Sequence, residues 1–278
     1  MDALVSTEWL AHAIEDPDLR IADCTWFLPG EGRDAAAEYA HGHIPAAVFM
    51  DLAEIVDTDA DAPMMLPPRE KFVSRLSRLG LGDGTRIILY DQSPHHTAAR
   101  GWAMLRSFGI TDVALLDGGL AKWRAEGKPL VGDATPPKAR HLTPPSQGAL
   151  IRTLAEMKQI LAEGSEQIVD ARSPSRFAGA EPEPRPGVEP GHIPGSTNLH
   201  YPRFFHDDGT WKQGAELAQV FAETGIDLDQ PIVATCGSGV TASVIAFAGH
   251  LLGREIPIYD GSWSEWGADP TTPKETGR

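Results

Sequence analysis

Short apolar runs alternate with longer helical stretches along the chain. The segments "QIVDA" (167–171), "PIVATC" (231–236) and "IPIYD" (256–260) are brief and mostly apolar, and each predicts a buried strand. Between the last two, "VTASVIAFAGHLL" (240–252) has the length and composition of a helix. This alternation predicts an α/β fold in which a mostly parallel sheet is flanked by helices.

One helix is marked at both of its ends. Thr153 and Glu156 have the spacing of a capping box, and Gly164 is suited to end the helix. The intervening apolar residues recur at helical spacing and form one face, made of Leu154, Met157, Ile160 and Leu161. A helix is therefore predicted immediately before the strand "QIVDA".

Four short motifs occur twice, in the same order. The pairs are "RIADCTW" (20–26) with "IVDARSP" (168–174), "GHIPAA" (42–47) with "GHIPGS" (191–196), "IILYDQS" (87–93) with "IVATCGS" (232–238), and "LLDGGLAKW" (115–123) with "IYDGSWSEW" (258–266). Matching positions in a pair lie between 143 and 149 residues apart, as Asp117 and Asp260 or Gly42 and Gly191 do. Repetition at so constant an offset indicates a tandem repeat of one domain.

The boundary between the two copies follows from composition. The segment "GDATPPKARHLTPPSQG" (132–148) is rich in proline and has no apolar periodicity, so it is interpreted as a linker. We therefore expect an N-terminal domain over 1–131 and a C-terminal domain over 149–278.

Charge and cysteine content narrow the functional classes. The 278-residue chain has 24 Lys and Arg against 39 Asp and Glu, a net charge of −15, which disfavours nucleic acid and anionic membranes as partners. No apolar run reaches the length of a membrane span, and the N-terminus lacks the pattern of a secretory signal. Two cysteines make neither a disulfide framework nor a four-ligand zinc site, so a reducing cytoplasm is expected.

One of those cysteines, Cys236, stands where a predicted strand meets a glycine-containing loop. Gly237 and Gly239 allow successive backbone N–H groups to turn inward at a helix N-terminus, which favours a thiolate. Ser238 and Thr241 can add hydroxyl hydrogen bonds to the sulfur. The first copy has Asp91 in place of the cysteine, followed by "QSPHHT". A buried, inert cysteine is the alternative, but a loop kept in one copy alone favours a reactive thiol.

The loop "CGSGVTAS" also limits the chemistry of that thiol. Cysteine phosphatases need an arginine that closes the loop around the phosphoryl oxygens, and no Arg or Lys follows Cys236 before Arg254. A cysteine protease would need a paired histidine, and nothing marks His250 for that role. A thiolate in a cradle of N–H groups instead suits attack on a polarisable sulfur atom, which leaves a persulfide.

These residues together resemble the rhodanese-like sulfurtransferase superfamily and, within it, the two-domain 3-mercaptopyruvate sulfurtransferases. The resemblance covers essentially the whole chain. It rests on the doubled "GHIP", the Asp91-for-cysteine exchange, "RFAGAEPEPRPGVEPGHIPGS" (176–196), "CGSGVT" (236–241) and "YDGSWSEW" (259–266). Thiosulfate-preferring members typically have two basic residues after the cysteine, whereas Gly237 and Ser238 stand there here. That difference favours 3-mercaptopyruvate as the sulfur donor.

The resemblance implies a two-step reaction with no metal or organic cofactor. Cys236 would attack the sulfur of 3-mercaptopyruvate, pyruvate would leave as its enolate, and a thiol, thioredoxin or cyanide would then take the sulfur from the Cys236 persulfide. By the same resemblance, Arg176 and Arg185 would bind the donor's carboxylate and carbonyl. The donor site would further include the loop residues Gly237, Gly239, Val240 and Thr241.

A Ser–His–Asp relay is a further implication of the resemblance. Ser238 would handle the proton, with His43 of "GHIP" and Asp34 of "GRDAAAEY" as partners. His43 has an alternative interpretation, because His192 holds the same position in the second copy, which indicates a hydrogen bond shared by both folds. His41, His95 and His96 complete no metal-ligand pattern with His43.

The remaining marked residues are expected to be structural. We interpret Arg172 as the ion-pair partner of Asp170, Cys24 as a buried core residue, and Trp263 and Trp266 as packing residues of the C-terminal helix.

Two other functions remain open from the sequence. One is a thiosulfate:cyanide sulfurtransferase, and the other is a noncatalytic persulfide carrier that delivers sulfur to a partner protein. A monomer is the default expectation for the oligomeric state.

Overall fold

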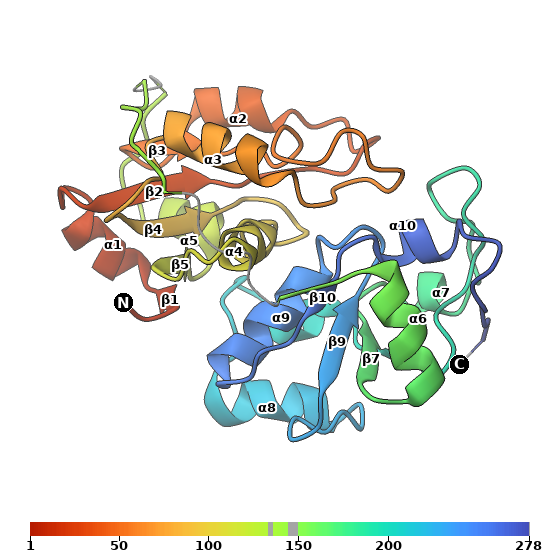
Figure 1. The fold of residues 1–278 in the computed structure, drawn as a ribbon. Coiled ribbons are helices and arrows are strands. Elements are labelled where there is room, and N and C mark those ends of the chain that lie inside the picture. Colours follow the sequence, from red (N-terminus) through yellow and green to blue (C-terminus); the bar gives the residue numbers. More distant parts are fainter. Residues whose placement is uncertain (133–135, 144–149, 278) are drawn as a thin grey trace. The chain divides into compact units, whose positions relative to one another are not determined.

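A computed structural model describes residues 1–132, 136–143 and 150–277 (Figure 1). Residues 133–135 and 144–148 of the predicted linker lie outside the described residues. The described chain divides into two compact units, and neither is contiguous in sequence. The first unit contains residues 1–56, 66–132, 136–143 and 205–211. The second unit contains residues 57–65, 150–204 and 212–277.

The first unit is built on a five-stranded sheet with the strand order β1-β5-β4-β2-β3. Its strands are β1 (Leu4–Val5), β2 (Leu19–Asp23), β3 (Ala47–Phe49), β4 (Arg86–Tyr90) and β5 (Val113–Leu116). Every pair of neighbouring strands in this sheet is parallel. The parallel α/β class predicted from the alternation of apolar runs is therefore confirmed for this unit.

Helices pack against both faces of that sheet (Figure 1). The helices are α1 (Thr7–Ala13), α2 (Ala35–His41), α3 (Arg69–Arg78), α4 (Ala98–Ser107) and α5 (Gly119–Ala125). Leu10, Tyr39 and Trp123 of α1, α2 and α5 join one buried cluster with strand residues such as Ile88. The α4 helix packs against β4 and β5, where Gly101 allows close contact with Leu89 and Cys24.

The second unit repeats this topology, with the strand order β6-β10-β9-β7-β8. Its strands are β6 (Ile151–Arg152), β7 (Gln167–Asp170), β8 (Thr197–Asn198), β9 (Ile232–Thr235) and β10 (Ile258–Tyr259). Here too every neighbouring pair is parallel. Each strand therefore has a counterpart at the same place in the other sheet, as the sequence repeat requires.

The helices of the second unit are α6 (Leu154–Glu163), α7 (Pro174–Phe177), the 3-10 helix η1 (Tyr201–Phe204), α8 (Gly214–Ala222), α9 (Ala242–Leu251) and α10 (Ser262–Trp266). Of these, α6, α9 and α10 lie where helices were predicted, and α7, η1 and α8 are additional. The capping box of Thr153 and Glu156 is present, and Gly164 ends α6 in the left-handed conformation with φ +61°. Trp263 and Trp266 are buried with α6 in one cluster, as expected.

In both units the loops that follow the central strands emerge at the carboxyl edge of the sheet. The β4 strand ends one residue before Asp91, and β9 ends one residue before Cys236. In parallel α/β sheets this edge is where ligands bind. Among the described residues, no helix combines the length and hydropathy that crossing a bilayer would require.

Candidate active site

Cys236 lies between the end of β9 and the start of α9, and only 1% of its surface is exposed. Gly239 has φ +77°, a left-handed conformation that favours glycine, so this residue allows the loop to turn back into the helix. The thiol is thus held at the carboxyl edge of the second sheet, next to a helix N-terminus, as predicted.

Hydrogen bonds fix the carbonyl groups of the loop and leave its N–H groups available. The N–H groups of Trp263 and Ser264 donate to the carbonyl oxygens of Cys236 and Gly237, each over 2.9 Å. The Ser264 hydroxyl also donates to the Gly237 carbonyl, over 2.6 Å. Within the described chain, no acceptor is bonded to the N–H groups of 237–241. These N–H groups are available to a ligand, and the anion-binding cradle expected from the glycines stays a prediction.

Ser262 is a residue of the site that the sequence reasoning missed. Its hydroxyl oxygen accepts a hydrogen bond from the Cys236 N–H over 3.3 Å and lies 4.0 Å from Cys236 Sγ. The same hydroxyl donates to the Tyr259 carbonyl over 2.8 Å. Ser262 has φ +49°, a costly conformation for a residue other than glycine, and its counterpart in the first copy is Gly119 with φ +54°. The signal was a serine in "DGS" where the other copy has "DGG".

Arg176 reaches the loop from the short helix α7, which begins after the capping residue Ser173. Guanidinium atoms Nη2 and Nη1 of Arg176 lie 3.2 and 3.4 Å from where a Cβ would stand on Gly237. The absence of a side chain at Gly237 therefore makes room for a cation beside the nucleophile. Arg176 is also ion-paired with Glu183.

Arg185 lies in an adjacent cavity of about 500 Å³. Its Nη2 donates to the backbone carbonyl of Asp61 over 2.7 Å, and the cavity is also lined by Ser264, the residue that binds the Gly237 carbonyl. The structure therefore brings Arg176 against the cysteine loop and places Arg185 in the neighbouring cavity of the same unit.

Arg172 forms the predicted ion pair with Asp170, at 2.7 Å between Nη2 and Oδ2, and its side chain is 1% exposed. Its guanidinium also lies over the Trp263 ring, 4.7 Å from the centroid. Burial by itself would lower the pKa of Arg172, but the charges of Asp170, Glu183 and Cys236 raise it above its ordinary value. Arg172 therefore stays charged within its ion pairs with Asp170 and Glu183.

Within the described residues, no hydrogen bond joins the remaining loop residues to the sulfur. Ser238 and Thr241 are half-buried, and Thr241 precedes α9 without a side-chain capping bond. Val240 is buried, and its carbonyl accepts from the Ser243 N–H over 3.2 Å. The predicted hydrogen bonds from Ser238 and Thr241 to the sulfur stay a prediction.

Asp34 and His43, the predicted relay partners, belong to the first unit. The Asp34 carboxylate caps α2 by accepting from the Ala37 N–H over 3.0 Å. His43 is 1% exposed, stacks on Tyr39 at 3.9 Å, and its Nδ1 lies 2.8 Å from the Tyr39 carbonyl oxygen. His192 repeats this arrangement with Phe177, at 3.8 Å between rings and 2.8 Å to the carbonyl oxygen. The hydrogen bond shared by the two histidines is confirmed, and their part in catalysis stays a prediction.

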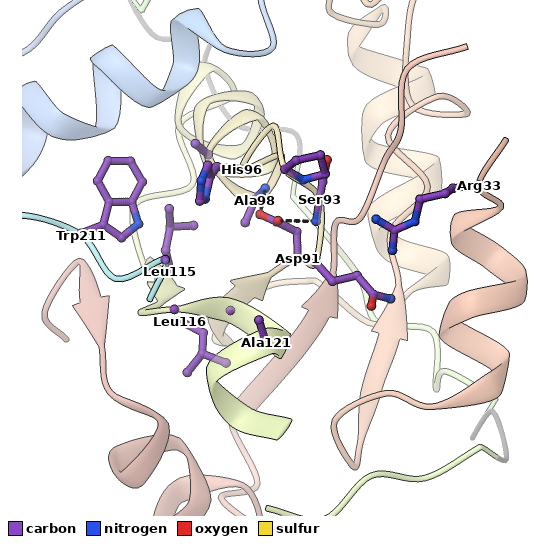
Figure 2. A pocket seen from close by; sticks show the side chains of 15 residues that line it. Arg33, Asp91, Ser93, His96, Ala98, Leu115, Leu116, Ala121 and Trp211 are labelled. Atoms are coloured by element: carbon purple, nitrogen blue, oxygen red, sulfur yellow. Dashed lines mark hydrogen bonds between the residues drawn. The ribbon is translucent and has the colours of Figure 1, made fainter. Parts of the chain in front are cut away.

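The corresponding loop of the first copy holds a carboxylate in its cradle (Figure 2). Asp91 Oδ1 accepts from the Ser93 N–H over 2.9 Å, and Oδ2 accepts from the Ala98 N–H over 2.7 Å. Burial raises the pKa of Asp91 to about 7 against these two hydrogen bonds, which lower it. A cavity of about 300 Å³ remains beside Asp91, with Leu115, Leu116 and Trp211 in its lining.

Known proteins share the repeat and the sheet topology described above. Residues 6–126 and 153–269 each match the rhodanese-like domain family. A 3-mercaptopyruvate sulfurtransferase from Homo sapiens is 42% identical over 271 residues, which are 95% of this chain and 91% of that protein. A thiosulfate sulfurtransferase from Cricetulus griseus is 39% identical over 272 residues, again covering 95% and 91%.

A solved structure agrees with these sequence matches. The crystal structure of SseA from Escherichia coli superposes with a TM-score of 0.85 at 34% identity, covering 95% of this chain and 99% of that one.

Proposed function

The chain belongs to the rhodanese family, and from this premise we propose that it is a sulfurtransferase that takes sulfur from 3-mercaptopyruvate through a persulfide on Cys236. One observation carries the proposal: a buried cysteine stands in a cradle of available N–H groups, with Arg176 against the next residue. That arrangement suits an anionic donor whose reacting atom is sulfur.

In the first half-reaction, the Cys236 thiolate attacks the sulfur of 3-mercaptopyruvate. A sulfur–sulfur bond forms, the carbon–sulfur bond breaks, and its electron pair leaves with the pyruvate enolate, which a proton then quenches. Arg176 binds the donor's carboxylate beside Gly237, and Arg185 contributes from the adjacent cavity. We propose Ser238 as the hydroxyl that handles the proton.

The persulfide left on Cys236 is an anion in the same cradle. The N–H groups of 237–241 stabilise it. In the second half-reaction a thiol or cyanide attacks the outer sulfur and releases the Cys236 thiolate, which completes a ping-pong cycle. Thioredoxin is the protein acceptor we propose.

The identity of the donor follows from the residues after the cysteine. Thiosulfate is a dianion, whereas Gly237 and Ser238 place no charge next to the sulfur, and Arg176 supplies one cation suited to a single carboxylate. Thiosulfate is the second candidate donor, since a relative of similar identity has the name thiosulfate sulfurtransferase. A higher kcat/KM for thiosulfate than for 3-mercaptopyruvate would reverse this choice.

The first copy has the same sheet topology as the second but lacks the cysteine nucleophile. Asp91 replaces the nucleophile and occupies its own cradle, so we propose that domain 1–131 is catalytically inactive and that 149–278 carries the reaction. The relay of His43 and Asp34 with Ser238 is part of this proposal, as are a monomeric state and a cytoplasmic location.

Mass spectrometry of the intact protein tests the function directly. After incubation with 3-mercaptopyruvate, Cys236 should be heavier by one sulfur atom, and addition of cyanide should remove that mass. The Cys236→Ser variant should neither gain the mass nor release pyruvate. Pyruvate release by that variant at the wild-type rate would exclude the proposed mechanism, and loading without repeated turnover would favour a persulfide carrier.

A further inference from the structure

The Arg176 guanidinium, which lies beside the cysteine loop, is held in place by Glu183, a residue that takes no part in the reaction described above. Glu183 lies in the segment between Arg176 and Arg185, and its side chain is 4% exposed. Its Oε1 accepts from Arg172 Nη1 over 2.9 Å, and its Oε2 accepts from Arg176 Nη2. One buried carboxylate therefore joins two guanidinium groups.

Arg172 is the fixed side of this arrangement. Its Nε and Nη2 donate to the Asp170 carboxylate over 3.0 and 2.7 Å, and Nη2 also donates to the Gly191 carbonyl over 2.7 Å. The Asp170 side chain is fully buried at the end of β7. Because Arg172 has these anchors in the sheet, the position of the Glu183 carboxylate is anchored as well.

Arg176 is the side that depends on Glu183. Its side chain is 25% exposed, and its buried Nε has no hydrogen-bond partner within the part of the chain that the structure describes. The ion pair with Glu183 thus directs a guanidinium that keeps donors unused, while the same group lies against Gly237. The buried Nε is closed to a ligand, but Nη1 is also unbonded within the described chain, lies 3.4 Å from the Cβ position of Gly237 and can donate to an anionic ligand.

The charges of the four residues balance. Asp170 and Glu183 supply two negative charges, and Arg172 and Arg176 supply two positive ones. Without the Glu183 charge, Asp170 would still balance Arg172, and the charge of Arg176 would be left unpaired next to a second guanidinium group. Since like charges in such surroundings repel strongly, Arg176 would move away from the loop.

We propose that Glu183 is a positioning residue that holds the Arg176 guanidinium against Gly237 at the anion-binding end of the donor site. This inference rests on the proposed function, because the anion in question is the carboxylate of the sulfur donor. It adds a residue that touches neither donor nor sulfur and acts through Arg176.

Alkylation of Cys236 tests this role without the sulfur-transfer reaction. Iodoacetate carries a carboxylate and iodoacetamide does not, so the ratio of their rates at Cys236 reports the cation beside the thiol. Peptide mass spectrometry assigns the modification to Cys236; the other cysteine, Cys24, is fully buried, and burial raises its pKa well above the ordinary value.

We expect Glu183→Gln to lower the iodoacetate-to-iodoacetamide ratio by about tenfold or more, the size expected for a lost charge-assisted hydrogen bond. The matched control is Glu181→Gln in the same segment, where the carboxylate bonds Ser175 on the exposed surface, and it should leave the ratio unchanged. In an Arg176→Ala background, Glu183→Gln should have little further effect, whereas a merely structural role would lower reactivity in both backgrounds.

Two results would overturn the inference: an unchanged ratio in Glu183→Gln, or an equal fall in the presence and absence of Arg176. If Glu183→Gln does not fold, Glu183→Asp replaces it, because it keeps the charge but shortens the reach. A ratio equal to the wild type in that variant would likewise contradict the proposal.

Turnover provides the separate check on the function itself. With 3-mercaptopyruvate, Glu183→Gln should raise KM by about tenfold or more and change kcat less, because Arg176 binds the donor before the chemical step. Wild-type protein that releases no pyruvate would overturn the proposed function alone, since the alkylation ratio does not depend on it.

Discussion

The two loops that follow β4 and β9 occupy the same place in the two copies of the fold but are used in two ways. In both, the residue after the central strand accepts a backbone hydrogen bond from the last helix of the copy, over 2.9 Å from Leu120 to Asp91 and from Trp263 to Cys236. In the first loop a carboxylate of the chain then takes up two N–H groups. In the second loop the side chain is a thiol, and the N–H groups of 237–241 stay available. The side chain after the central strand thus occupies the N–H groups of the first loop and leaves those of the second loop available.

The largest expected effect comes from giving the second loop the first loop's side chain. Cys236→Asp should lower pyruvate release by at least about 1,000-fold, because the nucleophile is gone. The introduced carboxylate should accept from the N–H groups of Ser238 and Ala242. Ser238 matches Ser93, and Ala242 begins α9 as Ala98 begins α4. The free energy of unfolding, measured by urea denaturation, should therefore stay within about 1 kcal/mol of the wild type.

A matched control separates cradle filling from simple loss of the thiol. Cys236→Leu removes the nucleophile equally but brings no acceptor, and its larger side chain should destabilise the protein by about 2 kcal/mol. Equal losses of stability in the two variants would show that the loops are not interchangeable.

A smaller effect is expected from the carboxylate of the first loop. Burial raises the pKa of Asp91 from 3.8 to about 7, so the folded chain binds this proton more tightly than the unfolded chain. The contribution of Asp91 to stability is thus greatest below pH 3.8 and is lost as the pH rises to about 7. Because the residue is partly exposed to its cavity, we expect this loss to be on the order of 2 kcal/mol.

Asp91→Asn measures that contribution as a difference. The free energy of unfolding is measured by urea denaturation at several pH values for the wild type and the variant. The difference between the two should fall by about 2 kcal/mol between pH 3.8 and about 7, the interval in which the carboxyl titrates. A difference that does not change over this interval would mean that Asp91 titrates at its ordinary value.

The smallest expected effect concerns the first helix of each copy. Ser6 caps α1 with one hydrogen bond, which its side chain accepts from the Trp9 N–H over 3.0 Å. Thr153 caps α6 in a capping box, in which the Glu156 carboxylate also accepts from the Thr153 N–H over 2.7 Å. Thr153→Ala should lower the free energy of unfolding by about 1 kcal/mol and Ser6→Ala by about half of that, with activity retained by both variants. A larger loss for Ser6→Ala would contradict this ranking.

Features encoded within one short stretch of sequence were predictable. The parallel sheets, the capping box at Thr153, the pair of Asp170 with Arg172 and the position of Cys236 each follow from local pattern or from comparison of the copies. The interpretation of His43 as a fold-level residue was also available, because His192 repeats it.

Features that depend on folding distant segments together were not predictable. Ser262 touches Cys236 only because α10 returns to the loop, and Glu183 bridges two arginines only because its segment folds back over α7. Asp34 differs from both, because its capping role in the structure has a local signal. An aspartate directly before the alanine-rich helical run "AAAEY" (35–39) is typical of a helix N-cap, so the sequence alone could have indicated that role.

The exchange of segments between the units has a consequence for synthesis of the chain. The first unit needs 205–211, whose Trp211 N–H donates to Asp117 over 2.9 Å and whose Phe205 stacks on His96. A ribosome therefore delivers most of the first unit, and then much of the second, before the piece that completes the first has emerged. We infer that the first unit is completed only after 205–211 has been synthesised, so its folding does not finish when its own strands have emerged.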